Sequence, residues 1–402
     1  MRIKVTAEDF RVEEQVDLPL DPHGGYTLYC VEKRGVTTPE VETLLARRLR
    51  RPPSAVRFPA LKDRSAVAVQ YVAVQGRGPA WAEGPGFVAR RMGRASRPLH
   101  PTDLRGNRFT VVVRDLAADE AAGLGARLAT LARDGLPNYF DQQRFGSRTA
   151  TGDFPGRRIL LRDAAGALHA HLAEPLEGDP PEVLAFKRTA AEHWGEWEVL
   201  FNAAPRPSNF RSVLTYLRDH PDDFRRALDL VTPRLLSLYV EAYQSLLWNR
   251  IVARYLLHRL GEPSATVEVA GERLPLFPSL AERLGEGVTI PLPSHRAVYE
   301  GDLADVVTEV LEEEGVALAD LKPRLLRRAY LPKGSRPLLL QPQQAGATSP
   351  EPDERFPGRQ RITVTFTLPP GSYATLVLRA MEREETRKEH ETRNTHHGER
   401  RS

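Results

Sequence analysis

The chain has 402 residues, of which 41% are apolar and 27% are charged, a composition typical of a globular protein long enough for two domains. No stretch approaches the roughly 18 uninterrupted apolar residues that a membrane helix needs, and residues 1–5 lack the apolar core of a signal peptide. Because Cys30 is the only cysteine, an internal disulfide and a cage of thiolate metal ligands are excluded, and we expect a protein of the reducing cytoplasm.

The formal net charge is only +4, but all except seven of the 57 basic residues are arginines. Arginine holds phosphate in a fixed fork geometry, which suits a nucleic-acid partner. A coding bias towards arginine explains the same excess more simply. Charge alone is therefore weak evidence for a nucleic-acid partner.

The N-terminal part of the chain alternates apolar with polar residues, a pattern typical of strands. It predicts strands over about residues 3–12 and 26–31. Thr38, Pro39 and Glu40 then supply a helix N-cap, a proline for the first turn and an acid for the positive end of the helix dipole. We therefore predict a helix from Thr38 to about residue 50.

Further strands are expected at 56–58, at 66–74 and at 109–113. The charged loop Lys62-Asp63-Arg64 joins the first two of these and belongs at the rim of the sheet. A turn at Gly106-Asn107 is expected to lead into the third.

An Ala- and Leu-rich helix is predicted over residues 120–133, and helical segments broken by prolines and glycines dominate the middle of the chain. The clearest of these segments has an apolar face over 239–260. Strands return at 338–340 and at 362–368, where the period of two is nearly perfect.

The C-terminal part of the chain carries two segments with little apolar patterning. Residues 341–360 are rich in proline, glycine and polar side chains, so we expect a long mobile hairpin loop there. A final helix is predicted over 372–385. Residues 386–402 are charged and lack apolar anchors, which predicts disorder.

Several residues could carry chemistry, but each has a simpler explanation when taken alone. Asp63 could be a loop aspartate paired with a neighbouring cation, and Phe140 could be an ordinary core residue. Glu13 and Glu14 are neighbours on a predicted strand, so only one of their carboxylates can face a given site.

Metal and cofactor motifs are weak in this sequence. His169 and His171 could share one face of a strand as metal ligands, but nothing nearby completes a site. No phosphate-cradling or dinucleotide-binding glycine motif occurs. We therefore expect neither a metal nor an organic cofactor.

Six short segments, taken together, occur in the order in which they occur in the TruD family of tRNA pseudouridine synthases, and the chain resembles that family from residue 3 to about residue 379. The segments are DFRVEE (9–14), KDRSAVAVQ (62–70), GNRF (106–109), NYF with RFG (138–146), QSLLWN (244–249) and LPPGSYAT (368–375). One departure is Trp248, where the family more often has phenylalanine, and we expect it to change packing only.

The resemblance implies an α+β fold with a discontinuous pseudouridine synthase catalytic domain. That domain would comprise residues 1–152 and 337–385 and would be built on a mixed or antiparallel sheet. A second α+β domain, specific to the family, would be inserted at 153–336. Residues 386–402 would form a disordered charged tail.

The resemblance also implies an activity, the isomerisation of a uridine of tRNA, at position 13, to pseudouridine. The active-site residues of the family map onto Asp63 as the catalytic carboxylate and Phe140 as the ring under the target base. Asn138 and Lys4 would be polar partners, Lys4 on the strength of a single-residue match. Because the reaction gains and loses no group and changes no oxidation state, it needs no cofactor. Beyond tRNA we expect neither a metal nor a membrane as a partner. We also expect the protein to be a monomer.

Two other functional classes stay open. A glycoside hydrolase also places a carboxylate at an anomeric carbon, but it needs a second acid at a defined separation, and no separate acidic motif stands out. A non-catalytic RNA-binding protein needs only a basic surface and aromatic rings. The intact Lys62-Asp63-Arg64 loop argues against that class.

Overall fold

The computed structural model describes residues 1–206, 208–285, 287–326 and 328–382, which form two compact units. The first unit consists of Met1–Leu136 and Leu340–Glu382, and the second of Pro137–Leu339. The short strands β7 (Leu136–Pro137) and β12 (Leu339–Leu340) lie where the chain passes from one unit to the other. The tail predicted at 386–402 lies outside the described residues.

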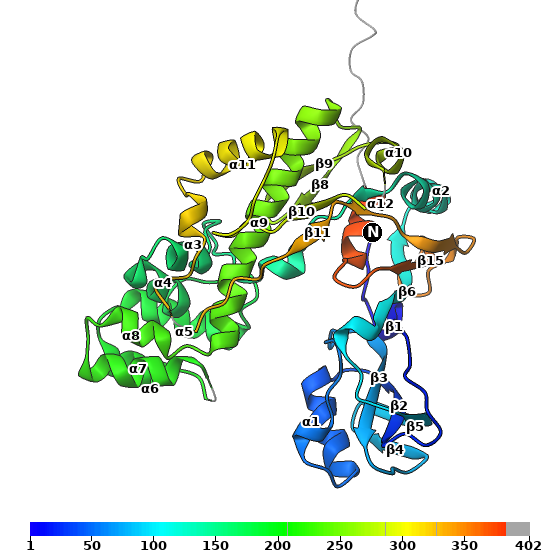
Figure 1. Ribbon diagram of the computed structural model, residues 1–402, viewed down its shortest axis with the longest axis horizontal. Coiled ribbons are helices and arrows are strands. Elements are labelled where there is room, and N and C mark those ends of the chain that lie inside the picture. The colour runs from blue at the N-terminus through cyan, green and yellow to red at the C-terminus, as the bar shows by residue number, and fades with distance from the viewer. Residues whose placement is uncertain (207, 286, 327, 383–402) are drawn as a thin grey trace, which may run out of the picture. The chain divides into compact units, whose positions relative to one another are not determined.

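A mixed sheet forms the first unit, in the strand order β13-β15-β6-β1-β3-β2-β5-β4, with β14 paired to β15 (Figure 1). Strands β1 and β3 run parallel, and the other neighbours are antiparallel. The predicted α+β class and mixed sheet are confirmed. The strands are β1 (Phe10–Val16), β2 (Tyr26–Lys33), β3 (Val67–Gln75), β4 (Trp81–Gly84), β5 (Phe87–Ala95), β6 (Leu104–Leu116), β13 (Gln343–Ala347), β14 (Glu351–Pro352) and β15 (Gln360–Leu368).

Strand β15 shows how the alternation of apolar and polar residues in the sequence corresponds to alternation of buried and partly exposed side chains. Ile362, Val364, Phe366 and Leu368 are buried, and the threonines between them are partly exposed. Since alternate side chains of a strand point to opposite faces, the apolar ones share the face that is covered by the unit's core. Helices α2 (Ala118–Asp134) and α12 (Ala374–Glu382) confirm the helices expected in these regions.

Helix α1 (Thr38–Arg48) lies beside strands β2 to β5 (Figure 1). Its buried Val41 and Leu45 pack in one cluster with residues of those strands, including Tyr29 and Val72. The helix was predicted correctly, but its N-cap is one residue earlier. Thr37 accepts a hydrogen bond from the backbone of Glu40 and donates its own N–H to the Glu40 carboxylate, which closes a capping box.

Four local predictions in this unit were wrong. The strand expected over 3–12 begins only at Phe10, after a short 3-10 helix (η1, Ala7–Asp9). Residues 56–58 form no strand, because the chain passes through a short 3-10 helix (η2, Pro53–Ala55) before Val56 enters the core. Gly106 is part of β6 and not of a turn. Its lack of a side chain serves a close approach of two strands, since a Cβ there would lie 2.7 Å from the backbone oxygen of Leu368.

The fourth wrong prediction is the loop at 341–360, where β13 and β14 both pair with β15. A buried charge cluster ties this segment to the rest of the unit. Arg114 bonds to Asp353 at 2.9 Å and to Asp9 at 2.9 Å, and all three side chains are buried. Such a long-range cluster leaves no local signal in a stretch of polar and glycine residues.

The second unit is mainly helical and is organised around helix α9 (Pro233–Leu260), which confirms and extends the helix expected over 239–260 (Figure 1). A Cβ on Gly156 would lie 2.0 Å from the backbone oxygen of Tyr239, so this glycine allows α3 to cross α9 closely. The elements are α3 (Pro155–Leu160), α4 (Ala164–Leu172), α5 (Pro181–Glu192), α6 (Trp197–Ala203), α7 (Phe210–Asp219), α8 (Phe224–Asp229), α10 (Leu280–Leu284), α11 (Asp302–Glu313) and the strand pairs β8 (Ala265–Val269) with β9 (Glu272–Leu276) and β10 (Thr289–Pro291) with β11 (Ser335–Pro337). No helix in the part of the chain that the structure describes is both long and apolar enough to span a membrane.

Candidate active site

Asp63 lies in the loop that precedes β3, as the sequence predicted, and the side chain is 47% exposed. The Asp63 carboxylate accepts a hydrogen bond from Lys4 Nζ at 2.9 Å, across 59 residues of chain. Lys4 itself has a left-handed backbone (φ 56°) and its ammonium lies 4.4 Å from the centre of the Phe10 ring. Asp63 and Lys4, which the resemblance paired, are therefore in direct contact.

The loop that carries Asp63 is held by buried polar residues. Lys62 forms an ion pair with the fully buried carboxylate of Glu14 at 3.0 Å, and the Lys62 N–H donates to Thr38 Oγ1. Gln70 donates to the backbone oxygen of Ala60 and to Glu14. Of the two neighbouring glutamates, Glu14 thus serves the loop. These contacts fix the backbone that leads into Asp63.

Lys33 holds the backbone of the same loop at Asp63. This residue was not identified from the sequence. Its buried ammonium donates to the backbone oxygen of Asp63 at 2.6 Å and to that of Val36 at 3.0 Å. Burial lowers the pKa of Lys33 to about 8, although the negative charge of Asp63 opposes that decrease. A lysine at the end of a strand gives no signal in the sequence that it will be buried.

Asn138 lies in the second unit and is almost completely buried. Its amide donates to the backbone oxygen of Pro337 at 3.1 Å and accepts from Arg336 Nη2 at 2.8 Å. Arg336 also donates through Nε to the Asn138 backbone oxygen at 2.7 Å. Asn138 therefore joins the segment that bears Phe140 to strand β11, some 198 residues away.

Phe140 follows two residues later and is clamped on several sides. Both its backbone groups bond to the side chain of Asn249, its N–H to Oδ1 and its oxygen to Nδ2, each at 2.8 Å. The ring packs edge-on against Trp248, with 5.5 Å between the two ring centres, and the Arg336 guanidinium lies 4.2 Å from the centre of the Phe140 ring. Trp248 thus packs directly against the ring.

Phe140 is only 8% exposed. A base that stacked on the face covered by Arg336 would require the guanidinium to move. Arg336 and Asn249 are the residues of this cluster that sequence reasoning missed. Asn249 had a signal, since it closes the QSLLWN segment, whereas Arg336 had none.

The four predicted site residues fall into two pairs, each described within its own unit. Lys4 and Asp63 meet in the first unit, and Asn138 and Phe140 lie two residues apart in the second. Each pair is surrounded by buried polar partners. Such partners hold reacting groups in a fixed geometry.

The two histidines considered as metal ligands do not form a site. They lie on helix α4 and not on a strand, so side chains two residues apart point in different directions. His169 contacts Glu174 and His171 contacts Tyr239. Within the described ranges, no group of three or more His, Cys, Asp or Glu side chains is placed to hold a metal ion.

Comparison with known proteins places this chain among RNA-modifying enzymes. The model of the family described as tRNA pseudouridine synthase D (TruD) matches residues 1–381. The chain belongs to the TruD family. A Methanopyrus kandleri protein named "Probable tRNA pseudouridine synthase D" is 32% identical over 375 residues, which cover 89% of this chain and 86% of that protein.

Other TruD relatives cover the chain equally well. The tRNA pseudouridine synthase D of Geobacter sulfurreducens is 31% identical over 398 residues, 94% of this chain and 92% of that protein. The crystal structure of a candidate tRNA pseudouridine synthase D from Methanosarcina mazei has the same fold, with a TM-score of 0.72 at 23% identity, over 94% of this chain and 93% of that one. The resemblance carried by the six segments is thereby confirmed.

Proposed function

We propose that this chain is an isomerase that converts uridine 13 of tRNA to pseudouridine, with Asp63 as the catalytic carboxylate. Membership of the TruD family supports the reaction class. The single observation that carries the assignment of Asp63 is its contact with Lys4 at 2.9 Å in a loop fixed by buried residues.

The reaction breaks the bond from C1′ of the ribose to N1 of uracil and forms one from C1′ to C5, while C5 loses its proton and N1 gains one. Asp63 either attacks C1′ and expels the uracil anion, or removes a proton from C2′ to give a glycal. Both routes need a carboxylate held against the sugar. The Lys4 ammonium stabilises that negative charge when the bound RNA displaces water.

Phe140 and Asn138 are proposed to act on the base side of the nucleotide. A flat ring allows a detached uracil to rotate in its plane, which a dense set of hydrogen bonds would resist. The bonds from Asn249 and the contacts of Trp248 and Arg336 hold the ring in place. Asn138 positions this segment through its bonds to β11.

We assign the attacking carboxylate to the sheet-bearing unit, and we assign the ring that holds the base, with a grip on the surrounding RNA, to the helical unit. The target base is stacked inside folded tRNA and has to be flipped out before the sugar can be attacked. We further propose that the protein acts as a cytoplasmic monomer. Neither route at Asp63 calls for a cofactor, because no electron or group enters or leaves the substrate.

The test is pseudouridine formation on an unmodified tRNA transcript with uridine at position 13, beside a matched transcript with cytidine there. We expect one pseudouridine per molecule in the first transcript and none in the second. Modification at another uridine would overturn the position, and binding without modification would favour an RNA-binding protein. RNA affinity should fall steeply with salt, because arginine contacts release counterions, whereas a glycoside hydrolase would show no such dependence.

A further inference from the structure

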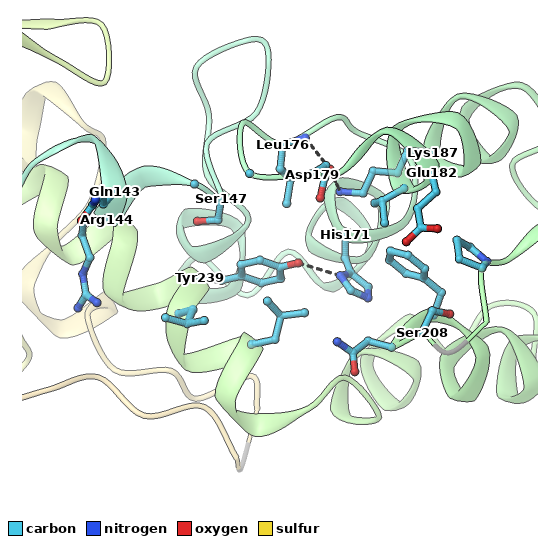
Figure 2. A pocket seen from close by; sticks show the side chains of 18 residues that line it. Gln143, Arg144, Ser147, His171, Leu176, Asp179, Glu182, Lys187, Ser208 and Tyr239 are labelled. Atoms are coloured by element: carbon cyan, nitrogen blue, oxygen red, sulfur yellow. Dashed lines mark hydrogen bonds and ion pairs between the residues drawn. The ribbon is translucent and has the colours of Figure 1, made fainter. Parts of the chain in front are cut away.

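The helical unit contains a pocket of about 470 Å³ that the proposed chemistry does not use (Figure 2). Its wall is formed by the segment after Phe140, the end of helix α4 and the loop after it, the loop before α7, and helices α5, α7 and α9. Apolar side chains make much of the wall, namely Leu176, Val183, Phe210, Leu235 and Leu238. A pocket of this volume with both apolar and polar side chains in its wall suits a ligand about the size of a nucleoside.

The charged side chains of the wall are balanced within the unit. The buried Lys187 pairs with Asp179 at 2.7 Å, and Arg144 pairs with Glu241 at 2.7 Å. Glu182 adds a negative charge at the exposed side. The interior of the pocket therefore has no surplus positive charge with which to hold a phosphate.

Three polar atoms of the wall are buried without a hydrogen-bond partner among the residues that the structure describes. They are His171 Nε2, Ser147 Oγ and Ser208 Oγ. His171 is fixed by the bond between its Nδ1 and the Tyr239 hydroxyl at 2.8 Å (Figure 2). Burial lowers the pKa of His171 to about 3, so its ring is neutral and Nε2 offers a single donor or acceptor.

Neutral hydrogen-bonding atoms beside apolar side chains match a flat ligand with a polar edge and apolar faces. A nucleobase has that chemistry, whereas a phosphate or a carboxylate does not. We propose that this pocket binds a nucleobase extruded from the tRNA at a position other than the isomerised uridine. The proposal rests on tRNA being the substrate.

Exposed arginines that adjoin lining residues in the sequence favour a base that is still part of RNA over a free nucleoside. Arg188, Arg206 and Arg234 adjoin the lining residues Lys187, Pro205 and Leu235 in sequence. None of the three has a carboxylate partner among the described residues. Such side chains are suited to the phosphates that flank an extruded base.

The test uses two leucines of helix α9 that differ in their relation to the pocket. Leu238 is 45% exposed and lines it, whereas Leu257 is 37% exposed and does not. Both positions accept a larger side chain at the surface. We expect Leu238→Trp to raise the Kd and the KM for the tRNA transcript about five- to a hundredfold, the usual effect of losing one bound base, with kcat unchanged. Leu257→Trp should match the parent.

The variant Ser208→Ala provides a second test, in which the melting temperature and the Kd for tRNA separate an effect on folding from an effect on binding. Removing a buried hydroxyl that has no partner should leave the melting temperature unchanged or slightly higher, while the Kd for tRNA rises about two- to tenfold. A lower melting temperature with an unchanged Kd would assign the hydroxyl to folding and overturn the proposal. Equal Kd values for Leu238→Trp and Leu257→Trp would overturn it as well.

Two further results keep this proposal distinct from the proposed function. If the parent makes no pseudouridine but the two tryptophan variants differ in tRNA affinity, the pocket assignment stands and the proposed function fails. If the parent is active and the variants bind alike, the pocket assignment fails alone. Binding of free adenosine, guanosine, cytidine or uridine to the parent at micromolar concentration, blocked by Leu238→Trp, would assign the pocket to a free nucleoside and overturn the RNA proposal.

Discussion

Replacing Asn249 by leucine tests how Phe140 is held. The substitution keeps most of the volume of a buried side chain but removes the bonds to the Phe140 N–H and backbone oxygen. Each buried backbone group that loses its partner costs about 1 to 3 kcal/mol, so we expect a loss of about 2 to 6 kcal/mol. In a unit of about 200 residues this lowers the melting temperature by roughly 4 to 24 °C.

Differential scanning calorimetry gives the melting temperature of the helical unit, and the exchange rate of the Phe140 amide reports the lost bond locally. Asn202→Leu is the matched control, because Asn202 is an exposed asparagine of the same unit, on α6. It should change the melting temperature little. If Asn249→Leu has the melting temperature of the parent and the same exchange rate of the Phe140 amide, then the two bonds do not stabilise the position of Phe140 and the reasoning is refuted.

Three other substitutions have defined outcomes. Lys4→Met should lower kcat for pseudouridine formation about ten- to a thousandfold with little change in melting temperature, because it removes the cation beside the reacting carboxylate; unchanged kcat in a single-turnover assay would count against that role. Phe140→Leu should keep the fold and lose about 1 to 3 kcal/mol of transition-state stabilisation in kcat/KM, and an unfolded but proportionally active variant would assign the ring to the core. His171→Phe should make the free energy of unfolding less dependent on pH below 6.5. The folded state holds the pKa of His171 at about 3 against 6.5 in a free side chain, so the unfolded chain takes up the proton first and the parent loses stability as pH falls from 6.5. By roughly pH 4.5 the parent should have lost about 2 to 3 kcal/mol more free energy of unfolding, measured in urea, than the variant has. Parallel plots of this free energy against pH for the two proteins would contradict the prediction.

Patterns that are local in sequence were predicted well. The alternation at 362–368 and the apolar face at 239–260 both became the expected elements, because period and burial are directly linked. Strand β13 (Gln343–Ala347) was missed, since glutamine and glycine have low strand propensity and its pairing partner β15 supplies the order. Tertiary pairing there overrides local preference.

The supporting residues of the site were harder to predict than the site itself. Arg336 reaches Asn138 across 198 residues and Lys33 reaches Asp63 across 30, distances at which no periodicity carries information. Lysine and arginine are also ordinarily surface residues, so nothing in the sequence marks these two as buried. The candidate catalytic groups were found through the six ordered segments, and their supports required the structure.

The central claim is that the Asp63 carboxylate carries the chemistry, and Asp63→Asn tests it most directly. The variant keeps the size of the side chain and removes its charge. In a single-turnover assay on the tRNA transcript we expect no detectable pseudouridine, with tRNA affinity close to that of the parent. Asp17→Asn is the matched control, because it removes a carboxylate from an exposed ion pair with Arg105 in the same unit and should leave activity intact. Product formation by Asp63→Asn at even a few per cent of the parental rate would contradict the account.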